Sequence, residues 1–442
     1  MTTVAIATLG CKVNQFESEA LMSSLEQRGY CLVPFEEGAD ITIINTCTVT
    51  HRADFQSRQM VRRAFRTNPK SLIIVTGCYS QVEPEAIAEI AGVKYLFGNR
   101  EKNRIPDLLP LIQKGELPQI QVADIQEETL FSDHSLPSFH RHTRSFLKIQ
   151  DGCNDRCSYC IVPYARGRSR SLAPERILDH LKILKARGFK EVVMTGIHIG
   201  AYGLDLSAPF SLERLLGRLE KEDTPERIRL SSVEPGDLSP GLLSCLAQST
   251  KICPHLHIPI QCGDDEILKM MNRDYGRVYL SDLIHELHQK IPKLSIGADV
   301  IVGFPGETEE KFSQSYQLIE SLPLSYLHVF PFSKRKGTPA SKFRHQVDQG
   351  EIKKRAGVMR ELGKKKRQAF YSQFLHQEVS VLVEDRREKE TGRWRGFSRN
   401  YIPVLLANGG RSEDHSNWVN QELRVVITEL TQNGVVGRVV EG

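Results

Sequence analysis

The sequence predicts an α/β protein in three parts: an N-terminal parallel α/β domain, a central partial (β/α)6 barrel, and a small C-terminal all-β barrel. Apolar segments alternate with helical segments up to about residue 110, and six βα repeats follow from residue 144. Only short strands follow residue 374. Continuous apolar strands that alternate with helices are typical of parallel sheets. We expect an N-terminal domain at 1–112, a linker at 113–142, the central unit with a basic connecting helix at 143–370, and the C-terminal barrel at 371–441.

The composition is that of an ordinary globular protein. Of the 442 residues, 40% are hydrophobic and 26% are charged. No apolar segment approaches the ~20 residues that a membrane span requires. The first seven residues lack the basic region of a signal peptide, so we expect a cytoplasmic protein with no membrane partner. Ten cysteines in that compartment favour metal or redox chemistry over disulfides.

In the N-terminal domain, three apolar segments are each followed two residues later by a cysteine. These segments are 4–9, 41–45 and 72–76, and the cysteines are Cys11, Cys47 and Cys78. Helices are expected between them at Glu17–Arg28 and Ala53–Arg66. Residues beyond the carboxyl ends of parallel strands share one edge of the sheet, where sites are built. We therefore expect the three thiols to hold one metal cluster, although a single such cysteine is more often an inert buried thiol.

A second trio of cysteines lies in the stretch Gly152–Cys160. Cys153, Cys157 and Cys160 are spaced by four and three residues, so their thiolates can converge on one metal centre. Thiolates are ligands of both zinc and iron–sulfur clusters. Zinc usually takes four ligands, and no Cys or His follows until His180. Three thiolates on a four-iron cubane leave one iron open for a substrate. The pattern favours a catalytic cluster, with zinc or free thiols as the alternatives.

The central region contains six predicted βα repeats. Strands are expected at 145–150, 191–196, 227–233, 255–261, 295–303 and 326–332. Helices are expected at 174–187, 211–221, 240–248, 264–271, 277–289 and 307–321. Repeats of this length suggest a partial barrel, whose sites lie at the carboxyl face. The second cysteine trio follows the first strand and therefore lies at that face.

Other strand ends offer groups for a ligand at the same face. Glycine allows a ligand to approach the backbone, and hydroxyls with a carboxylate suit a ribose or an amino group. Gly and Ser at strand ends are also ordinary turn residues, which is the alternative. The candidates are Thr195, Gly196, Ser232, Glu234 and Gln261.

Some polar residues have two interpretations. His255 and His257 share one face of a strand, where they could bind a metal or pack inside the barrel. A run of arginines, Arg166, Arg168 and Arg170, could bind an anion or lie in solvent. The histidines of the expected linker could bind metal, but an ordinary linker is the simpler interpretation; they are His134, His140 and His142.

Positive charge is concentrated in the last quarter of the chain. Residues 331–442 contain 22 Lys and Arg against 13 Asp and Glu, although the whole chain carries a net charge of only +5. The five short strands expected there suggest a closed barrel of a kind common in oligonucleotide binding. Trp394, Phe397 and Tyr401 lie among arginines, so they could stack on bases or form the core. A nucleic-acid partner is expected.

Together these features resemble the methylthiotransferase family of radical S-adenosylmethionine enzymes over essentially the whole chain. That family has an N-terminal cluster domain, a radical S-adenosylmethionine partial barrel and a C-terminal TRAM domain. Its C-x3-C-x-aromatic-C signature matches the second trio, with Tyr159 as the aromatic residue, and the N-terminal trio makes the match specific. The segment Thr8–Gln15 is similar to the branch that acts on N6-threonylcarbamoyladenosine in tRNA. The isopentenyladenosine branch typically has Gly-Cys-Gln-Met-Asn here, and the branch for a ribosomal-protein aspartate has Gly-Cys-Pro-Lys-Asn.

The resemblance implies two 4Fe-4S clusters, one held by Cys11, Cys47 and Cys78 and one by the Cys153 trio. It implies that S-adenosylmethionine serves as radical source and methyl donor, and that a methylthio group passes to C2 of the adenine next to the anticodon. The implied partners are tRNA and an electron donor such as a flavodoxin-type reductant. The alternatives are the same chemistry on isopentenyladenosine or on a protein aspartate, and a zinc-stabilised RNA-binding protein without catalysis.

Overall fold

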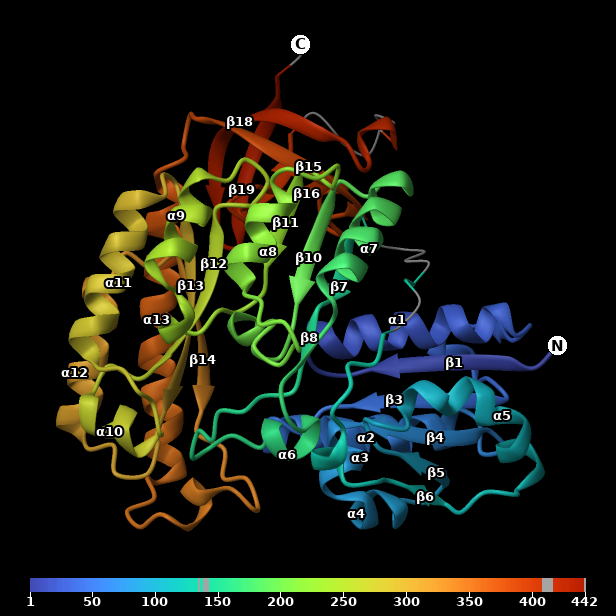
Figure 1. Cartoon of the computed structure of the whole chain (residues 1–442). Helices are drawn as coiled ribbons and strands as arrows, with labels where there is room; N and C mark the ends of the chain where they lie inside the picture. The colour runs from blue at the N-terminus through green and yellow to red at the C-terminus, as the bar shows by residue number, and fades with distance from the viewer. Residues whose placement is uncertain (134–135, 138–142, 408–415, 441–442) are drawn as a thin grey trace.

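The computed structural model describes residues 1–133, 136–137, 143–407 and 416–440. It confirms the predicted fold class, and Figure 1 shows the N-terminal domain and the C-terminal barrel at opposite ends of the central strands. The linker histidines His134, His140 and His142 lie outside the described residues. The expected domain boundaries at residues 112, 142 and 370 stay predictions.

The N-terminal domain is built on a six-stranded parallel sheet with the order β2-β1-β3-β4-β5-β6. Its strands are β1 (Thr3–Thr8), β2 (Cys31–Leu32), β3 (Ile41–Thr46), β4 (Leu72–Gly77), β5 (Val93–Phe97) and β6 (Ile120–Gln121). Its helices are α1 (Lys12–Gln27), α2 (His51–Thr67), α3 (Cys78–Val82), α4 (Pro84–Ala88) and α5 (Ile105–Lys114). Every residue of β3 is buried, as expected for a strand covered on both faces.

Two features of this domain differ from the prediction. Helix α1 begins at Lys12, five residues before the expected start at Glu17. Its first turns bury the polar residues Asn14 and Glu17, so the hydrophobic period does not reveal them. Strand β6 lies within the expected linker, because its two residues pair with β5 and complete the sheet.

Six parallel strands form the central unit, in the order β7-β10-β11 and β12-β13-β14. Bridges between Ile228 and Ile252 and between Ser232 and His257 join the two halves. The strands are β7 (Arg144–Lys148), β10 (Glu191–Thr195), β11 (Arg227–Leu230), β12 (His255–Gln261), β13 (Ser295–Val302) and β14 (Tyr326–Pro331). A short antiparallel pair, β8 (Gln150–Asp151) and β9 (Arg170–Ser171), flanks the cysteine loop.

The helices cover the outer face of these strands, as the apolar periodicity requires. Helix α8 (Leu212–Leu219) buries four leucines spaced at helical intervals, and the Ser211 hydroxyl caps it by accepting from the Arg214 amide at 3.2 Å. Each buried leucine contributes about 1.5–3 kcal/mol of hydrophobic stabilisation. The other helices are α6 (Val162–Arg166), α7 (Pro174–Ala186), α9 (Pro240–Gln248), α10 (Asp265–Met270), α11 (Arg277–Lys290), α12 (Glu309–Ser321) and α13 (Gln349–Ser372).

Seven short 3-10 helices complete the connections among the described residues. They are Phe35–Glu37, Lys102–Arg104, Ile125–Glu127, Ile199–Ala201, Pro235–Asp237, Pro339–Lys342 and Ser416–Trp418.

The C-terminal domain is a closed five-stranded barrel with the order β15-β16-β17-β19-β18. Its strands are β15 (Glu378–Arg387), β16 (Trp394–Ser398), β17 (Pro403–Leu406), β18 (Glu422–Thr431) and β19 (Gly434–Val439). This barrel packs on the amino ends of the central strands through charged groups. Arg227 donates to Glu422 at 2.8 Å, and Arg229 donates to the Arg399 carbonyl at 2.9 Å. Both arginines also hold the buried carboxylate of Glu191.

The aromatic residues of the C-terminal barrel do not form a base-stacking surface. Trp394 is only 6% exposed and Phe397 only 7%. The guanidinium of Arg144 lies 4.5 Å from the centre of the Phe397 ring, and that of Arg229 lies 4.6 Å from the Tyr401 ring. Trp394 thus belongs to the core of the barrel, whereas Phe397 and Tyr401 pack against the central unit.

Candidate active site

The three cysteines of the N-terminal trio (Cys11, Cys47 and Cys78) come from the ends of β1, β3 and β4. Cys11 is the N-terminal cap of α1, Cys47 follows β3, and Cys78 opens α3. Cys47 and Cys78 are buried, whereas Cys11 is exposed. Gly10 packs so tightly here that a Cβ on it would lie 2.7 Å from the Cβ of Cys47. The order of the strands in the sheet therefore brings together three cysteines that are far apart in the sequence.

A buried ionic network supports this trio from the side of the central unit. Arg166, at the end of α6, donates from Nε to the Cys78 sulfur at 3.3 Å and from Nη1 to Glu17 at 2.6 Å. Burial alone would raise the pKa of Glu17, but the surrounding cations hold this pKa well below its ordinary value. Those cations are Arg166, Lys102 and Lys148. Arg166 was expected either to bind an anion or to lie in solvent. In the structure it links the N-terminal domain to the central unit.

The loop trio (Cys153, Cys157 and Cys160) lies in a loop that is fixed by backbone hydrogen bonds to distant segments. The Cys153 amide donates to the Gly167 carbonyl at 3.0 Å, and the Cys160 amide donates to the Cys157 carbonyl at 3.0 Å. The Ser158 amide reaches the Met271 carbonyl at 3.0 Å. All three cysteines keep partial exposure, so a ligand can reach them.

The chemistry of both trios fits a metal cluster with thiolate ligands. Burial, followed by repulsion from a neighbouring cysteine, raises the pKa of Cys47 to about 12 and that of Cys160 to about 12. Burial also raises the pKa of Cys157 to about 11. Three such thiols cannot all ionise side by side without a positive centre, and metal binding supplies one.

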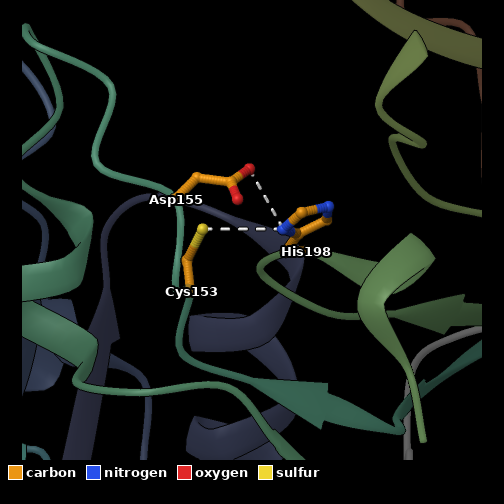
Figure 2. A group of neighbouring side chains, drawn as sticks. All are labelled: Cys153, Asp155 and His198. Atoms are coloured by element: carbon orange, nitrogen blue, oxygen red, sulfur yellow. Dashed lines mark hydrogen bonds and ion pairs between the residues drawn. The ribbon is translucent and has the colours of Figure 1, made fainter. Parts of the chain in front are cut away.

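His198 stands beside the loop trio and was not predicted (Figure 2). Its Nδ1 lies 3.6 Å from the Cys153 sulfur and 3.3 Å from an Asp155 oxygen, and its Nε2 lies 2.7 Å from Asp237. Burial opposes the charged imidazole, but the contacts with Asp237 and Cys153 outweigh it and raise the pKa of His198 to about 11. Cys153, Asp155 and His198 are close enough together to hold a cation.

Tyr159 and Glu234 both contact Arg273. Arg273 donates to Glu234 at 2.7 Å and to the Tyr159 hydroxyl at 3.1 Å. Burial raises the pKa of Glu234 against the opposing effect of Arg273. Beside them opens a cavity of about 860 Å³ that Cys157, His198, Glu234 and Arg273 help to line. This volume suits a ligand of nucleoside size.

Thr195 and Gly196 lie at the end of β10, next to Gln150. The Thr195 carbonyl accepts from the Ile149 amide at 2.9 Å, and a Cβ on Gly196 would lie 2.8 Å from Gln150 Oε1. That oxygen also accepts from the His198 amide at 2.8 Å. Thr195 and Gly196 thus position the backbone before His198.

Ser232, which is exposed, and Gln261, which is buried, lie beside a second polar group around His257 of β12. The Ser232 hydroxyl lies 2.7 Å from His257 Nδ1. Asp299 Oδ1 lies 3.1 Å from His257 Nε2 and 3.3 Å from His328 Nδ1, and these three residues could hold a cation. Gln261, Asp299 and Tyr159 line a cavity of about 160 Å³, together with Val49 and Thr50 just beyond Cys47. The lining of this cavity therefore includes residues that lie close in sequence to Cys47 and to Cys160.

The two histidines of β12 share one face as predicted, because the rings of His255 and His257 both lie 6.1 Å from that of Tyr326. Their polar partners differ. His257 faces Asp299, whereas His255 Nε2 contacts the Tyr326 hydroxyl at 2.8 Å and its ring lies 4.6 Å from that of Tyr401. Sequence reasoning missed Asp299, His328, His198 and Arg273. A charged residue inside the apolar strand Ser295–Val302 was the one available signal, and it pointed to Asp299.

Comparison with known proteins follows the same division of the chain. Residues 3–98 match the family described as "Uncharacterized protein family UPF0004", and residues 147–319 match the Radical SAM superfamily. The solved structure of the radical S-adenosylmethionine methyltransferase TsrM from Kitasatospora setae is similar in fold, with a TM-score of 0.58 at 16% identity over 77% of each chain. The central fold, the loop trio and the superfamily match together define a radical S-adenosylmethionine enzyme.

Relatives of known activity are similar over nearly the full length. The chain is 39% identical to the threonylcarbamoyladenosine tRNA methylthiotransferase of Bacillus subtilis, over 92% of this chain and 90% of the relative. It is 33% identical to the protein of the same name in Thermotoga maritima, over 99% and 96%. It is also 33% identical to the tRNA-2-methylthio-N(6)-dimethylallyladenosine synthase of Clostridium botulinum, over 89% and 88%.

The chain therefore belongs to the methylthiotransferase family of radical S-adenosylmethionine enzymes. Membership implies a [4Fe–4S] cluster and S-adenosylmethionine as cofactors. No helix in the described ranges is long and apolar enough to cross a membrane.

Proposed function

We propose that this enzyme adds a methylthio group to C2 of N6-threonylcarbamoyladenosine, next to the anticodon of a tRNA. The observation that carries the proposal is the 39% identity to a relative named for this substrate, over nine tenths of both chains. The relatives named for dimethylallyladenosine are 33% identical, which keeps that substrate as the runner-up.

Cys153, Cys157 and Cys160 would hold the first cluster, which supplies the reductive cleavage of S-adenosylmethionine to a radical when it is bound. The adjoining cavity of about 860 Å³, which Glu234 helps to line, would take S-adenosylmethionine. The other proposed contact positions lie outside the lining of this cavity, and they are Tyr159, Thr195, Gly196, Ser232 and Gln261. Glu234 is suited to an amino group because its carboxylate is 24% exposed at the cavity wall beside Arg273.

Cys11, Cys47 and Cys78 would hold a second [4Fe–4S] cluster, which supplies the sulfur that is methylated and transferred. The shared cavity of about 160 Å³ favours this arrangement, because Tyr159 precedes Cys160 of the loop trio and Val49 lies two residues beyond Cys47. The work of the chain itself is to hold the base between the two trios and to exclude water from the reaction.

The partners and location follow from the same function. A tRNA substrate would contact the basic surface of α13 and the C-terminal barrel mainly through its phosphates, so binding should weaken steeply with salt. The clusters require an electron donor such as a flavodoxin-type reductant, and the enzyme would act in the cytoplasm, where tRNA is modified.

Mass spectrometry of tRNA nucleosides tests the substrate directly. A strain that lacks the gene should lose 2-methylthio-N6-threonylcarbamoyladenosine and regain it on complementation. Loss of the 2-methylthio-isopentenyl nucleoside instead would establish the runner-up. Metal analysis of anaerobically purified protein tests the cofactors, because two cubanes require about eight irons per chain. A content of four irons per chain would rule out the second cluster. Stoichiometric zinc without iron would rule out the catalytic function.

A further inference from the structure

Lys12 lies next to the N-terminal trio and has no role in the proposed reaction. It directly follows Cys11 and is the first residue of α1. Its side chain is half-buried at the boundary between the N-terminal domain and the central unit, where α1 packs against β7. Within the described part of the chain, its ammonium group makes no hydrogen bond and no ion pair. A half-buried ammonium group without a partner in the chain is available to bind an anionic ligand.

The buried cations near the two trios that are named below are each neutralised by a carboxylate. Arg166 pairs with Glu17, and Arg273 pairs with Glu234. The same holds for three further residues, namely Lys102, Lys148 and Arg335. Lys12 differs from this group, although it is adjacent in sequence to a cysteine of the N-terminal trio.

The surroundings of Lys12 carry an excess of positive charge. The groups that interact with it electrostatically include Tyr401, Arg229, Arg144 and Glu191. The carboxylate of Glu191 is already shared between Arg227 and Arg229, with the nearest distances at 2.8 and 2.9 Å. No anion of the described chain is therefore left over for Lys12.

Arg229 and its neighbours face the interior of the central barrel. Along β11, Ile228 and Leu230 belong to the apolar core beneath the helices, whereas Arg227 and Arg229 point to the opposite face. Lys12 also influences the electrostatic environment of His255 on the neighbouring strand β12. Lys12 is therefore near enough to these interior residues to interact with them electrostatically, and its helix α1 packs against β7.

We propose that Lys12 is a specificity-determining residue that binds the carboxylate of the threonylcarbamoyl group. The inference rests on the proposed function. A threonylcarbamoyl group carries an ionised carboxylate, whereas a dimethylallyl group is wholly apolar. An anion brought into this interior needs a cation whose charge is not already used, and Lys12 offers one beside the N-terminal trio. This ion pair between Lys12 and the substrate carboxylate would position the modified base near Cys11. An apolar substituent would leave the lysine without a partner and would therefore bind more weakly.

A substrate and variant comparison tests this pairing in the full-length, cluster-reconstituted enzyme. The variants are Lys12→Gln, which removes the charge, and Lys12→Arg, which keeps it. Each is assayed with an anticodon stem-loop that carries threonylcarbamoyladenosine and with the same RNA carrying its carboxylate methyl ester. Both the dissociation constant of the RNA and the KM for methylthiolation are measured. Iron content and S-adenosylmethionine cleavage without RNA serve as controls for the integrity of the neighbouring Cys11.

The wild-type enzyme should prefer the free carboxylate by about tenfold or more, as expected for a hydrogen bond to a charged group. Lys12→Gln should lose this preference, mainly by weakening binding of the carboxylate RNA, and Lys12→Arg should retain most of it. An unchanged preference in Lys12→Gln, with normal iron content, would overturn the assignment. If the wild-type enzyme instead leaves both RNAs unmodified, the proposed function itself fails, and the two failures are thereby distinguished.

Discussion

The two cysteine trios are brought together by opposite structural routes. The N-terminal trio is assembled by topology, because its cysteines follow three different strands of one parallel sheet. The loop trio is assembled by local sequence, since Cys153, Cys157 and Cys160 lie within one loop between β8 and α6. The N-terminal trio therefore depends on the stability of a domain, whereas the loop trio depends on the conformation of a short segment.

The supporting contacts differ in the same way. Behind the N-terminal trio lies a buried ionic network around Glu17 and Arg166 that joins two domains. Beside the loop trio, Arg273 and Glu234 pair at the wall of a cavity that remains open to a ligand. The N-terminal support is thus mainly structural, whereas the loop support is available for binding.

The largest expected effect separates the two trios by chemistry. Cys157→Ala should abolish cleavage of S-adenosylmethionine, whereas Cys47→Ala should retain cleavage and lose methylthiolation. Each variant should keep about four of about eight irons, because the other trio is intact. Product analysis for 5′-deoxyadenosine and for the methylthiolated nucleoside measures both steps. The variants should bind tRNA with nearly wild-type affinity, and loss of all iron from either variant would show that the trios are not independent.

The contrast between the trios also explains what could be predicted from the sequence. The loop trio is encoded by spacing alone, and the N-terminal trio by the recurrence of a cysteine after each strand. The apolar segments of β3 and β4 were equally clear, because strands buried on both faces read as continuous runs. The two-residue strand β6 has no such signal, since only its pairing with β5 defines it.

Sequence patterns could not predict the long-range polar contacts. Glu17 and Arg166 are 149 residues apart, and nothing local marks them as partners. His198 resembles an ordinary loop residue until the fold brings it to Cys153. The aromatic residues of the C-terminal barrel illustrate the same limit, because the domain interface, which no local pattern encodes, decides whether Phe397 meets solvent or protein.

Glycine substitutions offer a way to disrupt one trio at a time. Gly10 has φ +97°, and its Cβ would meet Cys47 at 2.7 Å; Gly152 has φ +73°, and its Cβ would meet the Arg168 carbonyl oxygen at 1.9 Å. Gly10→Ala should therefore lower iron at the N-terminal trio, and Gly152→Ala should lower iron at the loop trio. Gly115→Ala is the control, because Gly115 has φ +74° with open space around it. It should cost about 1–2 kcal/mol and no iron. Equal iron loss in all three variants would contradict a local effect.

The ionic supports should differ in their contribution to stability. Arg166→Leu leaves the buried carboxylate of Glu17 short of a partner, so we expect a loss of about 3–5 kcal/mol in the free energy of unfolding. Arg273→Leu should cost less stability, because Glu234 keeps 24% exposure at the cavity wall, but it should weaken binding of S-adenosylmethionine. Urea unfolding of the metal-free proteins and a binding titration measure the two effects. Arg176→Ala, at a side chain that is 50% exposed, is the matched control and should cost less than about 1 kcal/mol.

The smallest expected effect concerns Asp299, in the cavity between the two trios. Burial would raise its pKa, but contacts with His257 and His328 outweigh burial and lower the pKa of Asp299 to about 2. A carboxylate whose folded pKa lies below its unfolded value of about 3.9 stabilises the fold above that value, and loses this contribution as the pH falls toward 2. Asp299→Asn should therefore be less stable than wild type by about 2 kcal/mol at pH 7, and the difference should shrink between pH 4 and pH 2. Asp179→Asn, whose side chain is 59% exposed, should match wild type at both ends of that range. A difference for Asp299→Asn that is constant with pH would instead assign the effect to packing, and the polar group around His257 would then be held together without the ionised carboxylate.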